Sequence, residues 1–370
     1  MTFRYVGALC ALLVLAGCDT GGNPLEDPED EATEGGGDGA GGGETPTDEG
    51  APIDTDRVLP PGTASPEPRV SIFRREQQDL DDQTSDTYGN GFAQNFAYDS
   101  ATDTFFVDGL AFDGSQPEGT RFARGVPGTL ATNFALYEGP AVEPDFFSGV
   151  PIGQFRHRAL YGISDSGNTE FAIVRTGSYI EYGFGGFIYQ RNNGVELPEG
   201  GQASYSGDYA GIRDFLGQGG LEYVEGDMEL DIDYGAFDGN CTADAACGNA
   251  VRGVVLNRTV YDVDGNDVTA TIVDALDEAN EDVTVTELPV LRFRIGPGVM
   301  DINGEATGEV FSVVAGDNYE EGTYYMVMSG DHNTAEGEIV GVVVVEADDV
   351  RAEDGITVRE TGGFIVNRNE

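Results

Sequence analysis

Apolar and acidic residues alternate in short runs through most of this chain, and this alternation is the feature that most limits its fold. In one such run Met228, Leu230, Ile232 and Tyr234 are each separated by a single acidic residue. Because successive side chains of a strand point to opposite faces, we expect these four to face a core and the acids to face water. Gly, Asn and Asp separate the runs at short intervals, and no convincing helical period occurs. The sequence therefore predicts an all-β protein.

Eight strand-like runs follow one another in the C-terminal half of the chain. They are residues 203–211, 222–234, 250–261, 288–295, 302–312, 322–329, 337–346 and 356–367. In the fourth run we expect Leu291 and Phe293 to face inward, between the outward Arg292 and Arg294. Eight antiparallel strands of this length can close into a barrel, which leaves no exposed edge. We therefore predict an eight-stranded antiparallel barrel.

Five short motifs occur in order along these runs. They are YSGDY at 205–209, GVVLNR at 253–258, GEATG at 304–308, AEGEIVG at 335–341 and ETGGFIVNR at 360–368. Their order resembles the barrel domain of transferrin-binding protein B and its family of bacterial surface lipoproteins. The resemblance implies a lobe in which a smaller, strand-rich handle domain precedes the barrel. It also implies a surface lipoprotein that binds a protein or a solute and passes an iron-bearing or nutrient ligand to an outer-membrane transporter.

The resemblance divides the folded part of the chain into a handle at 69–200 and a barrel at 201–370. Within the handle we expect hairpins of 92–98 with 104–112 and of 158–163 with 170–175, followed by strand residues in 179–190. The chain departs from the transferrin-binding members because it has room for one lobe where they carry two. No motif that contacts an iron carrier is recognisable, so no functional residue of the family is transferred.

A lipoprotein export signal occupies residues 1–17. Arg4 precedes an apolar run at 6–15, and Leu-Ala-Gly then precedes Cys18. This pattern resembles the bacterial lipobox, in which the cysteine becomes the acylated first residue of the mature protein. An uncleaved membrane anchor would need about 20 apolar residues, and this run is shorter. We expect an outer-membrane lipoprotein that faces the exterior, although Asp19 resembles an inner-membrane retention signal and leaves that alternative open.

Residues 18–68 are rich in Gly and acids and have no hydrophobic period, which predicts a disordered linker. It would serve as a stalk or as a solubilising spacer. The whole chain has 67 acidic and 19 basic residues, for a formal net charge of −48, and contains no lysine. Phosphate backbones would repel such a chain, and this excludes nucleic acid as a partner.

Cysteine usage agrees with export. Cys10 leaves with the signal and Cys18 is the predicted lipidation site, so Cys241 and Cys247 are the two that remain. We expect them to form a disulfide that closes a small loop between two strands. A metal site would need further Cys or His ligands at suitable spacing, and none is present in the sequence around them.

An aromatic cluster punctuated by glycines is the best candidate for partner binding. It consists of Tyr179, Tyr182, Phe184, Phe187 and Tyr189. Exposed aromatic residues are typical anchors of protein interfaces. The same spacing also fits the packed core of the handle, and the sequence leaves both interpretations open.

Two further segments invite a ligand but have simpler explanations. Residues 261–267 (YDVDGND) have alternating oxygen ligands as in a calcium loop, but an Asp-Gly turn explains them equally well. The basic run at 156–158 (RHR) could meet an anion or form a plain strand edge. His157 and His332 are the only histidines, and neither lies in a nucleophile motif. We therefore predict no catalytic residue, no metal and no cofactor.

Two functions remain from the sequence. One is a binding module that captures a protein or a solute at the cell surface. The other is a structural or shielding envelope lipoprotein without a dedicated ligand. A contiguous exposed aromatic patch would favour the first.

Overall fold

The computed structural model describes most of residues 58–370. The gaps are 81, 83, 86, 111–119, 141–146, 151–156, 178–181, 238–250, 281–282, 295–299, 353–354 and 370. The predicted signal peptide, most of the predicted linker, the lipidation site Cys18, the candidate Tyr179 and the Cys241–Cys247 disulfide therefore lie outside the described residues.

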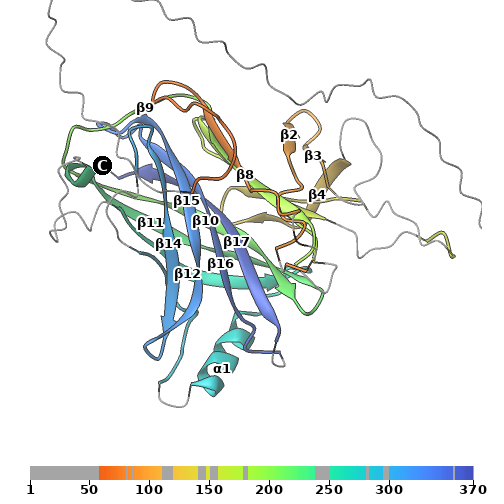
Figure 1. Cartoon of the computed structure of the whole chain (residues 1–370). Helices are drawn as coiled ribbons and strands as arrows, with labels where there is room; N and C mark the ends of the chain where they lie inside the picture. Colours follow the sequence, from red (N-terminus) through yellow and green to blue (C-terminus); the bar gives the residue numbers. More distant parts are fainter. Residues whose placement is uncertain are drawn as a thin grey trace, which may run out of the picture. The chain divides into compact units, whose positions relative to one another are not determined.

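A closed barrel of eight antiparallel strands forms the C-terminal part of the fold (Figure 1). Its strands are β10 (Gln202–Leu216), β11 (Leu221–Asp233), β12 (Val251–Asp262), β13 (Leu291–Phe293), β14 (Glu305–Val314), β15 (Asp317–Asp331), β16 (Glu338–Asp348) and β17 (Thr357–Arg368). Each strand pairs with the next along the chain, and the pairing of β10 with β17 closes the ring. The predicted barrel is confirmed. β10 continues five residues past its expected end, β15 begins five residues before its expected start, and β13 is shorter than expected.

The barrel interior follows the predicted alternation. Met228, Leu230 and Ile232 on β11 are at most 1 % exposed, and Leu291 and Phe293 on β13 are at most 3 % exposed. Arg292 and Arg294 are exposed, as expected. A core forms because apolar side chains from all eight strands meet inside the ring, where their burial from water stabilises it.

One α-helix contradicts the expectation that the chain has no helical period. This helix, α1 (Thr269–Ala279), lies between β12 and β13 at one end of the barrel (Figure 1). Ile272 and Leu276 are spaced by one helical turn, and both are buried in the barrel core. The apolar stripe is only two residues long, so the sequence carried too weak a period to reveal it. Among the described residues, no helix is long and apolar enough to cross a membrane.

A curled sheet of eight strands precedes the barrel and is called the handle sheet below. Its strands are β1 (Ile72–Arg75), β2 (Asn95–Asp99), β3 (Thr104–Asp108), β4 (Thr120–Leu130), β5 (Phe134–Glu138), β6 (Arg158–Ile163), β7 (Thr169–Arg175) and β8 (Gly185–Arg191). The predicted hairpins correspond to β2–β3 and β6–β7, and β8 falls in the third predicted segment. The sequence did not reveal β1, β4 or β5. Two short elements complete the fold, β9 (Val195–Glu196) and the 3₁₀ helix Tyr234–Phe237.

The ordered lobe begins before residue 69, where the linker was expected to end. Thr63 donates its backbone N–H to the carbonyl of Phe73 at 3.1 Å, and Arg75 donates to the carbonyl of Pro61 at 2.9 Å. Arg191 Nη2 donates to the carbonyl of Glu67 at 2.9 Å. These hydrogen bonds hold the end of the expected linker against β1 and β8.

The handle sheet packs on the outer face of the barrel. Two adjacent glycines of the ETGGF motif on β17 allow this close packing. A side chain at Gly362 would lie 2.1 Å from the Tyr209 hydroxyl inside the barrel, and one at Gly363 would lie 2.2 Å from the Phe171 ring of the handle sheet. Glycines are therefore required at both faces of β17, because the neighbouring rings occupy the space of a Cβ atom.

Candidate functional site

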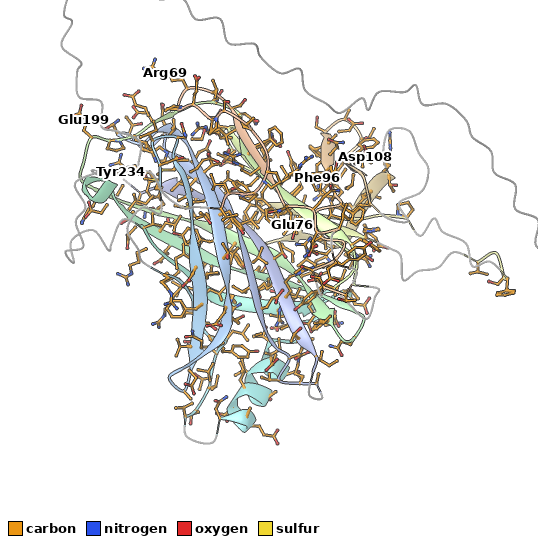
Figure 2. All side chains as sticks on the ribbon, in the orientation of Figure 1. Arg69, Glu76, Phe96, Asp108, Glu199 and Tyr234 are labelled. Carbon is orange, nitrogen blue, oxygen red and sulfur yellow. The ribbon has the colours of Figure 1, made fainter. Side chains whose placement is uncertain are left out.

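A cleft of about 490 Å³ lies between the handle sheet and the outer face of β15, β16 and β17. The handle side is formed by residues 58–60, 76–79, Thr87, Asn90 and Phe187; the barrel side is formed by 321–323, Tyr325, Val344, Glu346 and Arg359. Glu76 marks this region in Figure 2, where the handle strands meet the barrel. The volume is in the usual range of ligand pockets, about 300–1,000 Å³.

A series of alternating charges connects two residues of the cleft lining, Glu76 and Arg359. Glu76 accepts two hydrogen bonds from Arg175, at 2.9 and 3.2 Å. Arg175 Nε lies 3.9 Å from Asp214. Asp214 in turn accepts hydrogen bonds from Arg359 Nε at 3.1 Å and Nη2 at 2.6 Å. This series fixes the position of Arg359, because buried charges of opposite sign hold one another in place.

Arg359 keeps its charge although it is only 1 % exposed. Burial disfavours the charged guanidinium, but attraction by Asp214 outweighs that penalty and raises the pKa of Arg359 above its usual value. The guanidinium also lies over the Tyr182 ring, 4.2 Å from its centroid. Arg359 is therefore a rigidly held cation in the wall of the cleft.

Two buried polar atoms of the cleft lining have no hydrogen-bond partner among the described residues. One is a donor, Nη1 of Arg359, and the other is an acceptor, Oδ1 of Asn90. Asn90 is 6 % exposed. Leaving a buried polar group without a partner costs about 1–3 kcal/mol. Buried polar groups usually have a partner in the protein or in ordered water, so a partner from outside the chain would complete each of these two atoms.

The rest of the lining combines an apolar floor with an acidic rim. Phe187 and Tyr325 stack with their ring centroids 6.0 Å apart. The exposed carboxylates of Glu321 and Glu346 lie at the rim, together with the half-buried Asp79. A ligand that is apolar in part and basic in part would complement this surface.

The candidate aromatic cluster is divided by the structure. Phe187 lines the cleft, and Tyr182 lies beneath Arg359 while its hydroxyl makes a 2.9 Å hydrogen bond with Thr357. Tyr189 is fully buried in the core, and Phe184 is half-buried against Phe92 at 5.3 Å. These four rings therefore do not form a contiguous exposed patch.

The other predicted features do not form sites in the described structure. In the basic run 156–158, Arg156 lies outside the described residues. Arg158 pairs with Glu138 at 3.0 Å and donates to the Tyr223 hydroxyl at 3.1 Å, so its guanidinium is engaged within the lobe. His157 is 4 % exposed, and His332 is fully buried. Burial lowers the pKa of His332 to about 4, which leaves it neutral at physiological pH.

The segment 261–267 closes on itself. Asp262 Oδ1 accepts the backbone N–H groups of Asp264 and Asn266 at 2.9 and 2.8 Å. Hydrogen bonds from Asn266, by side chain and backbone, lower the pKa of the Asp262 carboxyl. The turn connects β12 to α1. In the described part of the chain, no three His, Cys, Asp or Glu side chains gather as metal ligands would.

Sequence reasoning did not identify Asn90 or Arg359 as site residues. Asn90 lies between Gly89 and Gly91 and reads as an ordinary turn residue. Arg359 left a signal, because it interrupts the apolar alternation of its strand together with Glu360. Two adjacent charged residues point to opposite faces of a strand, and when the strand is buried this indicates a charged partner on each side.

No protein-family model matches the sequence, and no curated protein matches it. Solved structures similar to this chain include a transferrin-binding protein B from Haemophilus parasuis, described as a vaccine antigen, with 11 % identity and a TM-score of 0.34. Another is an intact transferrin-binding protein B with N and C lobes, with 12 % identity and a TM-score of 0.31. Each match covers 74 % of this chain but only 44 % and 45 % of the other, so the chain spans less than half the length of these proteins.

Proposed function

We propose that this protein is a lipid-anchored binding protein that holds a peptide segment of a partner protein in the cleft. The observation that carries the proposal is that two residues lining one cleft, Arg359 and Asn90, each have a buried polar atom without a partner, Nη1 and Oδ1. A peptide group offers a carbonyl oxygen to the first and an N–H to the second. Such a ligand would give both buried atoms a hydrogen-bond partner.

The floor and the rim narrow the class of peptide. An apolar side chain would pack on Phe187, Tyr325 and Val344, and basic side chains beside it would meet the acidic rim. We therefore expect a segment with an apolar residue flanked by arginine or lysine.

The proposal places the lobe at the cell surface. Acylation at Cys18 would anchor the chain in the outer membrane, and the linker would extend the lobe away from the lipid. The partner protein would be captured from the exterior and passed to an outer-membrane transporter. Retention in the inner membrane through Asp19 is the alternative address.

A single tryptophan can report on the cleft, because the natural chain contains none. We would introduce Tyr325→Trp in a soluble form that starts at residue 18 and carries Cys18→Ser. The blocked tripeptide Arg-Leu-Arg should change its fluorescence in a saturable way, and blocked Glu-Leu-Glu should not, since the rim is acidic. If Arg-Leu-Arg leaves the fluorescence unchanged, the cleft is not a peptide site and a structural or shielding role is the better account.

A further inference from the structure

A second, smaller pocket lies within the handle sheet, against β2, β3, β6, β7 and β8. Its volume is about 120 Å³, and none of its lining residues belongs to the cleft described above. The lining consists of Phe96, Ala97, Tyr98, Phe105, Tyr161, Glu170, Phe171, Ala172, Ile188 and Gln190. Figure 2 labels Phe96 on the handle-sheet side of the molecule.

Five of these residues are aromatic, and the rings of four of them, Phe96, Tyr98, Phe105 and Tyr161, form one connected group. Tyr98 and Tyr161 have ring centroids 5.3 Å apart, and Phe105 lies 5.4 Å from Tyr161 and 5.8 Å from Phe96. Phe105 is 1 % exposed, whereas Tyr98 is 39 % exposed. The pocket therefore has a buried aromatic base and an accessible aromatic edge.

Glu170 adds one negative charge to this aromatic lining. It accepts hydrogen bonds from the Tyr161 hydroxyl at 2.7 Å, from Gln190 Nε2 at 2.6 Å and from Asn192 Nδ2 at 3.1 Å. All three donors are neutral, so these bonds orient the carboxylate without neutralising its charge. Burial, and then the hydrogen bond to Glu170, raise the pKa of Tyr161, which keeps this hydroxyl protonated as a donor.

We propose that this pocket binds an alkylammonium group. Aromatic rings attract organic cations, and a nearby carboxylate adds a Coulombic attraction. The volume equals about four water molecules' share of the liquid, which suits a headgroup such as trimethylammonium. A small metal ion would be poorly served, because it needs several oxygen ligands and the aromatic lining supplies few.

The same chemistry can come from a free solute or from a lysine side chain of a protein, and the probes separate these sources. Choline presents a trimethylammonium group, and 3,3-dimethylbutan-1-ol has the same shape without the charge. Nα-acetyl-lysine-N-methylamide presents the lysine headgroup. Binding would be followed by saturation-transfer NMR of each probe with the soluble form of the full mature chain.

We expect choline or the lysine probe to bind and the neutral alcohol to bind at least about tenfold more weakly. Glu170→Gln should lower the affinity for the cationic probe by a similar factor, and so should Tyr98→Leu. The control is Phe73→Leu on β1, where an aromatic ring of similar exposure, 44 %, lies outside the pocket. Unchanged melting temperatures would show that the variants remain folded.

Two results would overturn the proposal. One is binding of choline and of the neutral alcohol with equal affinity, which would make the pocket merely apolar. The other is the absence of binding by both cations. Neither result bears on the cleft, because the two sites share no residue and Tyr325→Trp reports only on the cleft.

Discussion

Replacing Arg258 by Met should destabilise the lobe more than any exposed arginine replacement. Arg258 lies on β12 inside the barrel and is bonded to Glu320 at 2.8 and 2.6 Å, to Glu360 at 3.1 and 3.2 Å, and to the carbonyl of Pro289 at 2.8 Å. The side chains of Arg258, Glu320 and Glu360 are between 3 % and 6 % exposed. Burial opposes the charge of Arg258, but the two glutamates outweigh it and raise its pKa.

The expected loss in the free energy of unfolding comes from the buried carboxylate that the substitution leaves unpaired. Arg258→Met would leave the buried carboxylate of Glu320 without its cation, whereas Glu360 would keep the Tyr209 hydroxyl at 2.7 Å and Arg213 at 3.5 Å. Breaking a buried pair in this way costs about 3–5 kcal/mol. The matched control is Arg294→Met, because Arg294 also pairs with a glutamate at 2.6 Å but with side chains 55 % and 68 % exposed. That exposed pair should contribute about 0.2–1 kcal/mol.

The assay is urea unfolding followed by far-UV circular dichroism, at low and at high salt. The loss in Arg258→Met should be insensitive to salt, whereas screening should reduce the smaller effect of Arg294→Met. The double variant Arg258→Met, Glu320→Met should lose less than the sum of its single variants, because each removes the other's unpaired charge. Equal losses for Arg258→Met and Arg294→Met would refute the buried network.

Three other outcomes are expected. Because the pKa of His332 is lowered from 6.5 to about 4, its contribution to stability should be present above pH 6.5 and lost as the pH falls toward 4; His332→Gln should lose less over that window in pH-dependent urea unfolding. Cys18→Ala should abolish fatty-acid labelling, and persistent labelling would contradict the lipoprotein hypothesis. Cys241 and Cys247 should resist alkylation until a reductant is added, and alkylation of both without reductant would contradict the predicted disulfide.

Strand alternation made the barrel predictable. In β11, the spacing of Met228, Leu230 and Ile232 directly encodes which face is buried, because the period of a strand is two. The helix α1 was not predicted, because Ile272 and Leu276 alone cannot establish a period of 3.6 residues. The hydrophobic pattern therefore predicted an element where it extended over several residues, and it did not where it was limited to two.

The cleft could not be predicted in the same way. Asn90, Phe187 and Arg359 are far apart in the sequence, and only the packing of the handle sheet on the barrel brings them to one surface. The aromatic cluster pointed to the right strand, β8, but not to which of its rings face the cleft. Phe187 and Tyr189 are both buried in the same core cluster, and of the two only Phe187 lines the cleft.

The most direct test of the peptide-binding cleft is Asn90→Leu on the Tyr325→Trp background, with the exposed Asn95→Leu as control. Leucine is close to asparagine in size and removes the unused acceptor, so the ligand-free protein should keep or raise its melting temperature. Its affinity for Arg-Leu-Arg should fall at least about tenfold, which corresponds to one lost hydrogen bond. A lowered melting temperature with unchanged affinity would show that Asn90 serves the fold and would contradict the proposed site.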